Sequence, residues 1–422
     1  MQKQLVNTIF SRVASTTLNF LVALMIARHS GPAIKGETTL VTTVIFFFVF
    51  FSNVLGGQVL VYLLPRNSAS VLLLPAILWS LLISVAGYVF LLVTHLLPEN
   101  YILFVSFLSW IAALISIQQA LLLAQQRLQL ANLLSLVPLA LQVAGIALCF
   151  KVFNVHDVWA YLYATLVAYL LTHFLSIVVL WKDLSNMPFR FSWADVKSSF
   201  SYGFQFQLVE ILQLLNLRYY FFQLGLQQGT QYLGIYSIGI SILEAVWVLP
   251  RSINTVHYIN TANSKELQQE AERTLLLCRV SLVLSALAVG VFFLVPNSVF
   301  TTVFGHGFSE VKHSVRYLGA GIVMYGLVHV ISAFYLGIAH YKPLIISNLL
   351  GFLSVVVFGY LLIPTYVMSG AGLAATASFT VCAAVLLIFF LKTSKMPVTA
   401  LLPKREDAIF FNTLVKTIFT KR

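Results

Sequence analysis

Apolar runs of about 20 residues recur along the whole chain, and they restrict its fold more than any other feature. In an α-helix such a run rises about 1.5 Å per residue and crosses a hydrocarbon core of about 30 Å. Hydrophobic residues make up 59% of the 422 residues, and charged residues 9%. Because the runs do not alternate in strands of about 10 residues, a β-barrel is disfavoured. The sequence predicts an all-α polytopic membrane protein with about 12 transmembrane helices.

The predicted spans form two halves of six on either side of the longest internal polar stretch. The expected parts are an N-terminal six-helix lobe at 1–181, a cytosolic linker at 182–199, a C-terminal six-helix lobe at 200–391 and a basic amphipathic cytosolic tail at 392–422. In this tail an apolar stripe is flanked by basic residues, which predicts a short helix on the anionic inner leaflet.

Two pairs of glycines occupy matching places in the two halves. Gly31 and Gly36 bracket a short outer loop before the second predicted span, and Gly229 and Gly234 bracket a loop before the eighth. Equal spacing at the same place in two six-span halves is the pattern that a duplicated transporter would leave.

The distribution of basic residues predicts the orientation. In a soluble chain, a net charge of +12 would suggest nucleic acid as a partner. Here the predicted inner side carries sixteen basic residues and the outer side five, among them Lys35. Because basic residues accumulate on the cytosolic side, both termini are expected in the cytosol, and no nucleic-acid partner is expected.

Charged residues lie at membrane depth in two predicted spans, at about 200–224 and 232–257. The first span holds Glu210 and Arg218, and the second holds Glu244 and Arg251. A central charge costs at least about 2.5 kcal/mol, so such groups usually face a bundle interior or a wet cavity.

Polar residues also share one face of a predicted helix. In the second charged span, one stripe within about 80° of arc includes Ser241, Glu244 and Arg251. The first span of the chain carries Arg12 and Asn19 on a polar face of about 100°. These stripes indicate a cavity between helices.

Several motifs resemble those of a known family. They are the run from Tyr232 to Gly239 continuing to Leu249-Pro-Arg251, the segment Phe304-Gly-His-Gly-Phe308, the segments Leu362 to Tyr366 and Gly370 to Ala375, and Ala27 to Pro32 with Gly36. Together they resemble bacterial polysaccharide flippases of the multidrug/oligosaccharidyl-lipid/polysaccharide exporter superfamily. Twelve predicted spans in place of fourteen argue against the related peptidoglycan-precursor flippases.

The resemblance implies two six-helix lobes around a central cavity that opens alternately to the two sides of the bacterial inner membrane. The cargo it implies is a polyprenyl-pyrophosphate-linked oligosaccharide, moved to the outer leaflet. The expected partners are this glycan, membrane lipids and polysaccharide assembly proteins.

A pyrophosphate needs positive charge and several hydrogen-bond donors, and arginine supplies both. The predicted substrate-binding residues are Arg12, Arg218, Arg251, Glu210, Glu244, Asn19 and Ser241. Other roles stay open, because Arg12 and Arg251 could extend to the membrane surface and Arg218 could pair with Glu210 or Glu244.

Two other functions stay open as well. An ion-coupled multidrug-type exporter would use the two glutamates, and a membrane polysaccharide polymerase or glycosyltransferase would need a large outer loop. No catalytic residue, metal site or cofactor is expected, because no loop carries paired carboxylates or metal-ligand spacing and the three cysteines stand alone in apolar spans. The driving force is left open between an H⁺ gradient, an Na⁺ gradient and the membrane potential.

Overall fold

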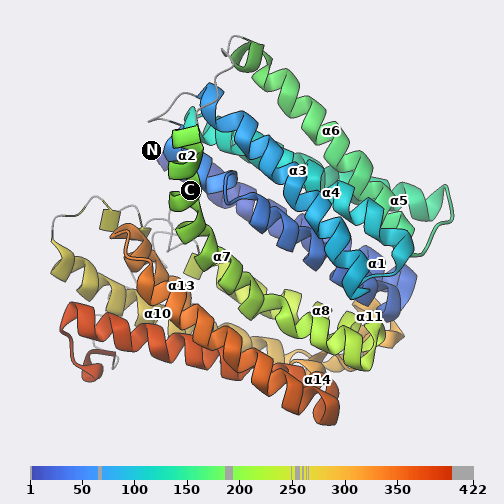
Figure 1. Ribbon diagram of the computed structural model, residues 1–422. Helices are drawn as coiled ribbons and strands as arrows, with labels where there is room; N and C mark the ends of the chain where they lie inside the picture. The colour runs from blue at the N-terminus through green and yellow to red at the C-terminus, as the bar shows by residue number, and fades with distance from the viewer. Residues whose placement is uncertain are drawn as a thin grey trace. The chain divides into compact units, whose positions relative to one another are not determined.

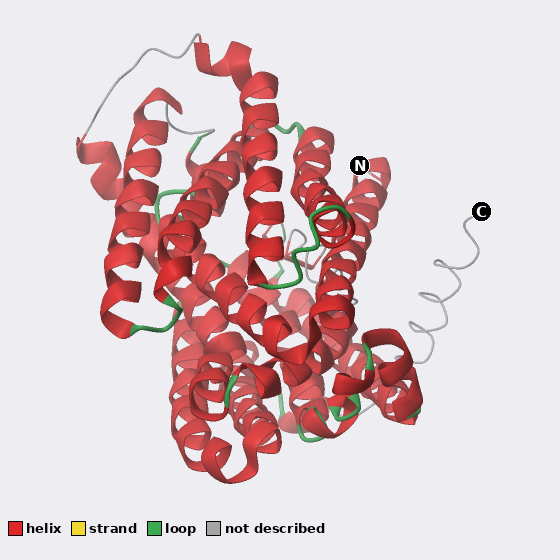
Figure 2. Cartoon of the chain, turned by 90° about the vertical axis from the view of Figure 1, so that its right-hand side faces the viewer, coloured by secondary structure: helices red, strands yellow, loops and turns green. Residues whose placement is uncertain are grey.

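The computed structural model consists of helices joined by short loops, and no strand occurs among the residues that it describes (Figure 2). These are residues 2–64, 69–185, 193–248, 250–251, 257–258, 261–262, 264 and 266–401. The predicted all-α fold is confirmed. Most of the predicted tail at 392–422 lies outside the described residues.

Contacts divide the chain into two compact units. The first comprises Met1–Ile238 and Phe300–Glu310, and the second comprises Gly239–Val299 and Val311–Arg422. The division by contacts falls within two helices, one that contains residues 238 and 239 and one that contains residues 299 and 300. The predicted lobes, joined by a linker at 182–199, remain a prediction.

The first unit is formed by seven helices, the start of an eighth and the later segment Phe300–Glu310 (Figure 1). They are α1 (Gln2–Ser52), α2 (Gly57–Leu63), α3 (Ala69–Thr94), α4 (Glu99–Ala124), α5 (Leu128–Lys151), α6 (Val158–Ser185), α7 (Trp193–Gln228) and α8 (Thr230–Glu244). Helix α1 packs along α4, α5 and α7, and α5 packs along α6. Buried side chains such as Leu60 and Leu122 form an apolar core where α2 meets α4.

The second unit contains the end of α8 and the later helices. They are η1 (Ala245–Trp247), α10 (Leu267–Leu294), α12 (Val311–Ser314), α13 (Leu318–Gly337), α14 (Lys342–Ser394) and η3 (Val398–Leu401). Two short helices, α11 (Asn297–Phe304) and η2 (His306–Phe308), lead back to the first unit. Helix α13 packs between α10 and α14.

Local sequence signals set several helix ends. Helix α4 follows Pro98 and has Glu99 in its first turn, where the positive end of the helix dipole stabilises a carboxylate. Helix α11 stops before Gly305, whose φ of 102° is one that glycine adopts without strain.

Two predicted loops are single-residue kinks. Helix α1 runs through the expected loop at 31–36 and leaves helical geometry only at Gly31, where φ is 81°. Pro32 then begins the next helical stretch, a position for which its fixed φ is suited. In α14 the only non-helical residue is Val367, with φ of 50°; the sequence also predicts a loop here, at 364–372, between the last two spans.

Eight helices among the described residues are long and apolar enough to cross a membrane. Of these, α1 and α14 are each long enough to cross twice, on either side of their kinks. Helices α7 and α8 are outside this set: α7, with 36 residues, is long enough to cross a membrane, whereas α8, with 15, is shorter than the about 20 residues that a crossing needs. Helices α7 and α8 are the ones that carry Glu210, Arg218 and Glu244.

Candidate functional site

Two glycines bring the second half of α1 into backbone contact with the start of α8. A methyl group at Gly36 would overlap the carbonyl oxygen of Thr230, and one at Gly234 would overlap that of Pro32. Only glycine permits such an approach. The second glycine of each sequence pair, Gly36 in one and Gly234 in the other, therefore lies at the contact between the two helices.

This close approach places two hydroxyl groups side by side, each three residues after its glycine. Thr39 Oγ1 lies 3.2 Å from Ser237 Oγ. Thr39 donates its hydroxyl hydrogen to the carbonyl oxygen of Lys35 at 2.8 Å, and Ser237 donates to the carbonyl oxygen of Gly234 at 2.9 Å. Both residues are buried. The glycines at matching positions in the two halves thus bring two hydroxyl groups together inside the first unit.

Lys35 lies next to these hydroxyl groups and is buried, with 8% of its surface exposed. Its ammonium group donates to Thr39 Oγ1 at 2.8 Å. No carboxylate of the described residues forms an ion pair with it. The predicted position of Lys35 in an outer loop is wrong, because the chain kinks only at Gly31 and the helix continues through Lys35.

Arg218 on α7 is near enough for its charge to act on Lys35. Its side chain is half-buried, its guanidinium lies 5.0 Å from the ring centre of Phe221, and Nη1 donates to the carbonyl oxygen of Leu217 at 2.9 Å. Lys35, Thr39 and Ser237 therefore lie together where α1 meets α8, and Arg218 on α7 is within range of the charge of Lys35. We call Lys35, Thr39, Arg218 and Ser237 the cationic cluster.

Arg251 belongs to the second unit and contacts an aromatic group there. Its Nε donates to Nε2 of His329 at 3.4 Å, and its guanidinium lies 5.4 Å from the ring centre of Trp247. His329 is buried and packs edge-on against Trp247 and Tyr325. Because Nε2 accepts this hydrogen bond, neutral His329 carries its hydrogen on Nδ1.

The other predicted site residues are divided between the units. Arg12 and Asn19 are exposed on α1, and Asn19 Nδ2 donates to the carbonyl oxygen of Ser15 at 2.9 Å. Glu210 is half-buried on α7, two turns from Arg218. In the second unit, Ser241 is exposed and Glu244 half-buried at the end of α8. The substrate-binding roles of all seven residues remain predictions.

Sequence reasoning missed Lys35 and His329. For Lys35 a signal was present: Gly31-Pro32 favours a kink followed directly by a helix, and in a helix Lys35 and Thr39 share one face. His329 is a lone histidine in an apolar span, and its partner lies 78 residues away in sequence. No local pattern connects it with Arg251.

Replacing His329 by leucine is expected to lower transport about tenfold, because Arg251 loses the buried acceptor that holds Nε and such a bond to a charged group is worth about 1.5–3 kcal/mol. His329→Gln, whose amide oxygen accepts, should retain most of the activity. Transport rate measured beside membrane abundance checks both variants. Equal loss in both would contradict the hydrogen-bonding role.

The chain resembles solved transporter structures over nearly its whole length. A lipid II flippase, MurJ, in an inward closed conformation shares 15% identity with a TM-score of 0.74, over 100% of this chain and 94% of that chain. An inward-facing multidrug resistance transporter of the MATE family shares 13% identity with a TM-score of 0.73, over 90% of this chain and 94% of that one. A MOP superfamily transporter from Pyrococcus furiosus Vc1 shares 13% identity with a TM-score of 0.65, over 94% of this chain and 95% of that one.

These likenesses define the class: the chain has the fold of the MOP superfamily transporters. Residues 70–313, more than half of the chain, match the family described as Polysaccharide biosynthesis protein. The chain therefore belongs to this family, and the family resemblance found in its motifs is confirmed. Among curated proteins, no sequence matches the chain.

Proposed function

We propose that the protein is a flippase that moves a polyprenyl-pyrophosphate-linked oligosaccharide from the cytosolic to the outer leaflet by alternating access, for cell-surface polysaccharide biosynthesis. The observation that carries this proposal is the burial of Lys35 without a carboxylate partner among the described residues, within range of the charge of Arg218. Burying a cation is costly unless an anion or several acceptors compensate it. A phosphate group of the substrate would supply that compensation.

The cationic cluster offers the kinds of donor that a phosphate uses. Arginine presents a planar fork that can bind two phosphate oxygens, and lysine acts as a point charge. The hydroxyl groups of Thr39 and Ser237 supply neutral polar groups beside them. Lys35 donates to Thr39 with one of its three ammonium hydrogens, which leaves capacity for an anion.

Family and fold support the same cargo class. The matching family carries the description Polysaccharide biosynthesis protein, and one protein of this fold is a lipid II flippase. Multidrug resistance transporters share the fold too, so a drug exporter is the competing function. A buried lysine beside an arginine disfavours a cationic drug because like charges repel.

The cargo is tested by removing the gene from its host. We expect polyprenyl-pyrophosphate-linked oligosaccharide to accumulate with its glycan on the cytosolic side, and the surface polysaccharide to disappear. Reintroducing the wild-type gene should restore both. Unchanged surface polysaccharide with increased sensitivity to cationic drugs would favour the exporter instead.

We propose the bacterial inner membrane as the location, with both termini in the cytosol. Polysaccharide assembly proteins are the proposed protein partners. Reporter fusions after Asn154 and after Lys395 should read outside and inside respectively, because sequence places most basic residues on the inner side. The opposite readings would contradict this orientation.

A further inference from the structure

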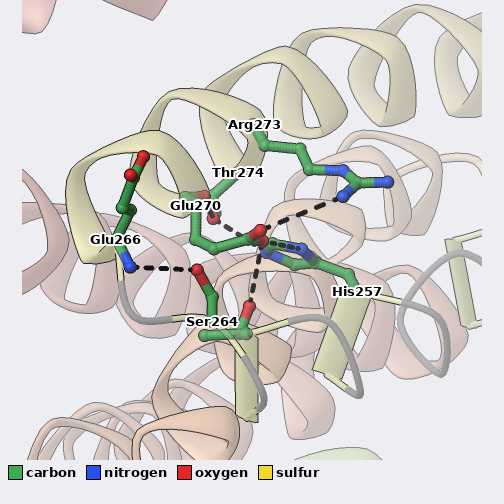
Figure 3. Close-up of polar contacts among 7 residues, drawn as sticks. His257, Ser264, Glu266, Glu270, Arg273 and Thr274 are labelled. Atoms are coloured by element: carbon green, nitrogen blue, oxygen red, sulfur yellow. Dashed lines mark hydrogen bonds and ion pairs between the residues drawn. The ribbon is translucent and has the colours of Figure 1, made fainter.

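A polar network in the second unit holds the chain where it enters α10 (Figure 3). Nε2 of the buried residue His257 lies 2.8 Å from Oγ1 of Thr274, and Nδ1 lies 3.6 Å from Oε2 of Glu270. Arg273 Nη1 lies 3.9 Å from the other carboxylate oxygen of Glu270. These contacts tie residue 257 to the first turns of α10, and none of the residues predicted to bind substrate takes part in them.

A polar network in the first unit reaches the helix that carries Lys35. Tyr161 on α6 is buried, and its hydroxyl oxygen lies 2.8 Å from Oγ1 of Thr42 on α1. Thr42 Oγ1 also lies 2.6 Å from the carbonyl oxygen of Thr38, to which it can only donate. A threonine hydroxyl has one hydrogen, so Thr42 accepts from Tyr161. Tyr161 therefore donates a hydrogen bond from α6 to α1.

Helix α5 holds Tyr161 from the other side. Gln142 Nε2 on α5 donates to Oγ1 of Thr165 at 2.7 Å, and Thr165 Oγ1 donates to the carbonyl oxygen of Tyr161 at 2.6 Å. Gln142 and Thr165 are both buried. The donor to Thr42 thus belongs to a part of α6 that is itself bonded to α5.

The second half of α1 depends on side contacts for its rotation about the helix axis. At Gly31 the chain leaves helical geometry, with φ of 81° and ψ of 179°, and glycine changes these angles at little cost. At the other end α1 stops at Ser52, and α2 begins only at Gly57. Because neither end continues as a regular helix, packing against α6 and α8 must fix how the stretch between them is turned.

Lys35, Thr39 and Thr42 share one face of this stretch, because residues three, four and seven apart in a helix lie within about 60° of arc. Helix α8 contacts the face through Ser237, 3.2 Å from Thr39, and α6 contacts it through Tyr161. A rotation of α1 that broke the bond between Tyr161 and Thr42 would also move the ammonium group of Lys35. The two ends of this face are therefore mechanically linked.

We propose that Tyr161 is a positioning residue for the cationic cluster: its hydrogen bond to Thr42 fixes the rotation of α1 that aims Lys35 at the cargo. This inference rests on the proposed function, in which Lys35 binds a phosphate of the cargo. Tyr161 acts through Thr42, to which its only hydroxyl hydrogen is donated. Loss of this bond should weaken the recognition of phosphate specifically.

The test is flipping by the purified full-length protein in vesicles. These carry the polyprenyl-pyrophosphate-linked oligosaccharide or the same glycan joined to the lipid without phosphate. In Tyr161→Phe the preference for the pyrophosphate-linked lipid should fall at least about threefold, because one neutral hydrogen bond that positions the ammonium group is lost. The rate for the lipid without phosphate should stay within about twofold of wild type. A residue that only stabilised the fold would lower both rates together and leave the preference unchanged.

Matched variants isolate the hydrogen bond. Thr42→Val removes the acceptor and should lower the preference as Tyr161→Phe does, whereas Thr42→Ser keeps the hydroxyl and should retain it. Tyr163→Phe makes the same change at an exposed tyrosine of α6 and should behave as the wild type. Added to Lys35→Met, Tyr161→Phe should lower neither rate further, because it acts through Lys35.

A wild-type preference in both Tyr161→Phe and Thr42→Val would overturn the inference while the proposed function stands. So would a further loss when Tyr161→Phe is added to Lys35→Met. The two variants of Thr42 decide the matter even where Tyr161→Phe fails to fold. Equal rates for the two lipids in the wild type would refute the binding of phosphate and this inference with it, so the two failures are distinguishable.

Discussion

Replacing Lys35 by methionine is expected to lower glycan export about tenfold or more while the protein reaches the membrane in wild-type amount or above. Methionine has a similar length and no charge, so the variant no longer buries an ammonium group for which the described part of the chain supplies no carboxylate. Stability is therefore maintained or increased. Export falls because a bond from a charged donor to the phosphate, worth about 1.5–3 kcal/mol, is lost.

A matched control is Lys312→Met. Lys312 is half-buried in the second unit and donates to the carbonyl oxygen of Val295 at 3.1 Å. Its removal takes away the same charge outside the cationic cluster, and export should stay within about twofold of wild type. Wild-type export by Lys35→Met would show that Lys35 does not contact the cargo.

Variants of Arg218 distinguish a role in substrate binding from a role in a structural ion pair. Arg218→Ala should reduce export at normal abundance, and Arg218→Lys should restore it only in part, because lysine lacks the bidentate fork. If Arg218 only neutralised Glu210, the single variant would fold poorly. In that case, changing Glu210 to glutamine as well would restore abundance and export together.

The second large effect is expected at the contact between α1 and α8. Changing Gly36 or Gly234 to valine should sharply lower the amount of folded protein, because even a methyl group there overlaps a backbone carbonyl that cannot move aside. The cost should exceed the roughly 1–3 kcal/mol typical of overpacking. The measurement is the monodisperse fraction after extraction in detergent.

Gly290 in α10 is the control for this prediction. Nothing lies within 4 Å of a methyl group placed there, and alanine favours a helix over glycine by about 1 kcal/mol. Gly290→Ala should therefore fold as well as the wild type or better. Normal folding of Gly36→Val would mean that α1 and α8 do not approach as closely as described.

Particular residues show how far the sequence could predict this structure. Apolar length predicted the helices, and the two glycine pairs marked the matching places in the two halves. The matching glycine spacing could not indicate that these two places touch, because the close backbone approach at Gly36 and Gly234 depends on how the helices pack in the folded structure. Gly31 was assigned to a loop because glycine and proline together usually mark turns, but one residue with positive φ is enough to redirect a helix.

The candidate site was less predictable than the fold. Arg218 was found because a charge at membrane depth is visible in the sequence. Lys35 was counted among the outer charges, since its burial depends on where α1, α7 and α8 meet. The pairings of Arg251 with His329 and of His257 with Glu270 depend on tertiary contacts that no spacing in a single sequence reveals.

The most direct test of the central claim, that the cationic cluster recognises a phosphate of the cargo, is flipping by the purified protein in lipid vesicles. The vesicles carry either the polyprenyl-pyrophosphate-linked oligosaccharide or the same glycan joined to the lipid without phosphate. The wild type should move the pyrophosphate-linked glycan at least about tenfold faster than the uncharged one, and Lys35→Met should remove most of that difference. Equal rates for the two lipids, or a wild-type preference in Lys35→Met, would contradict the claim.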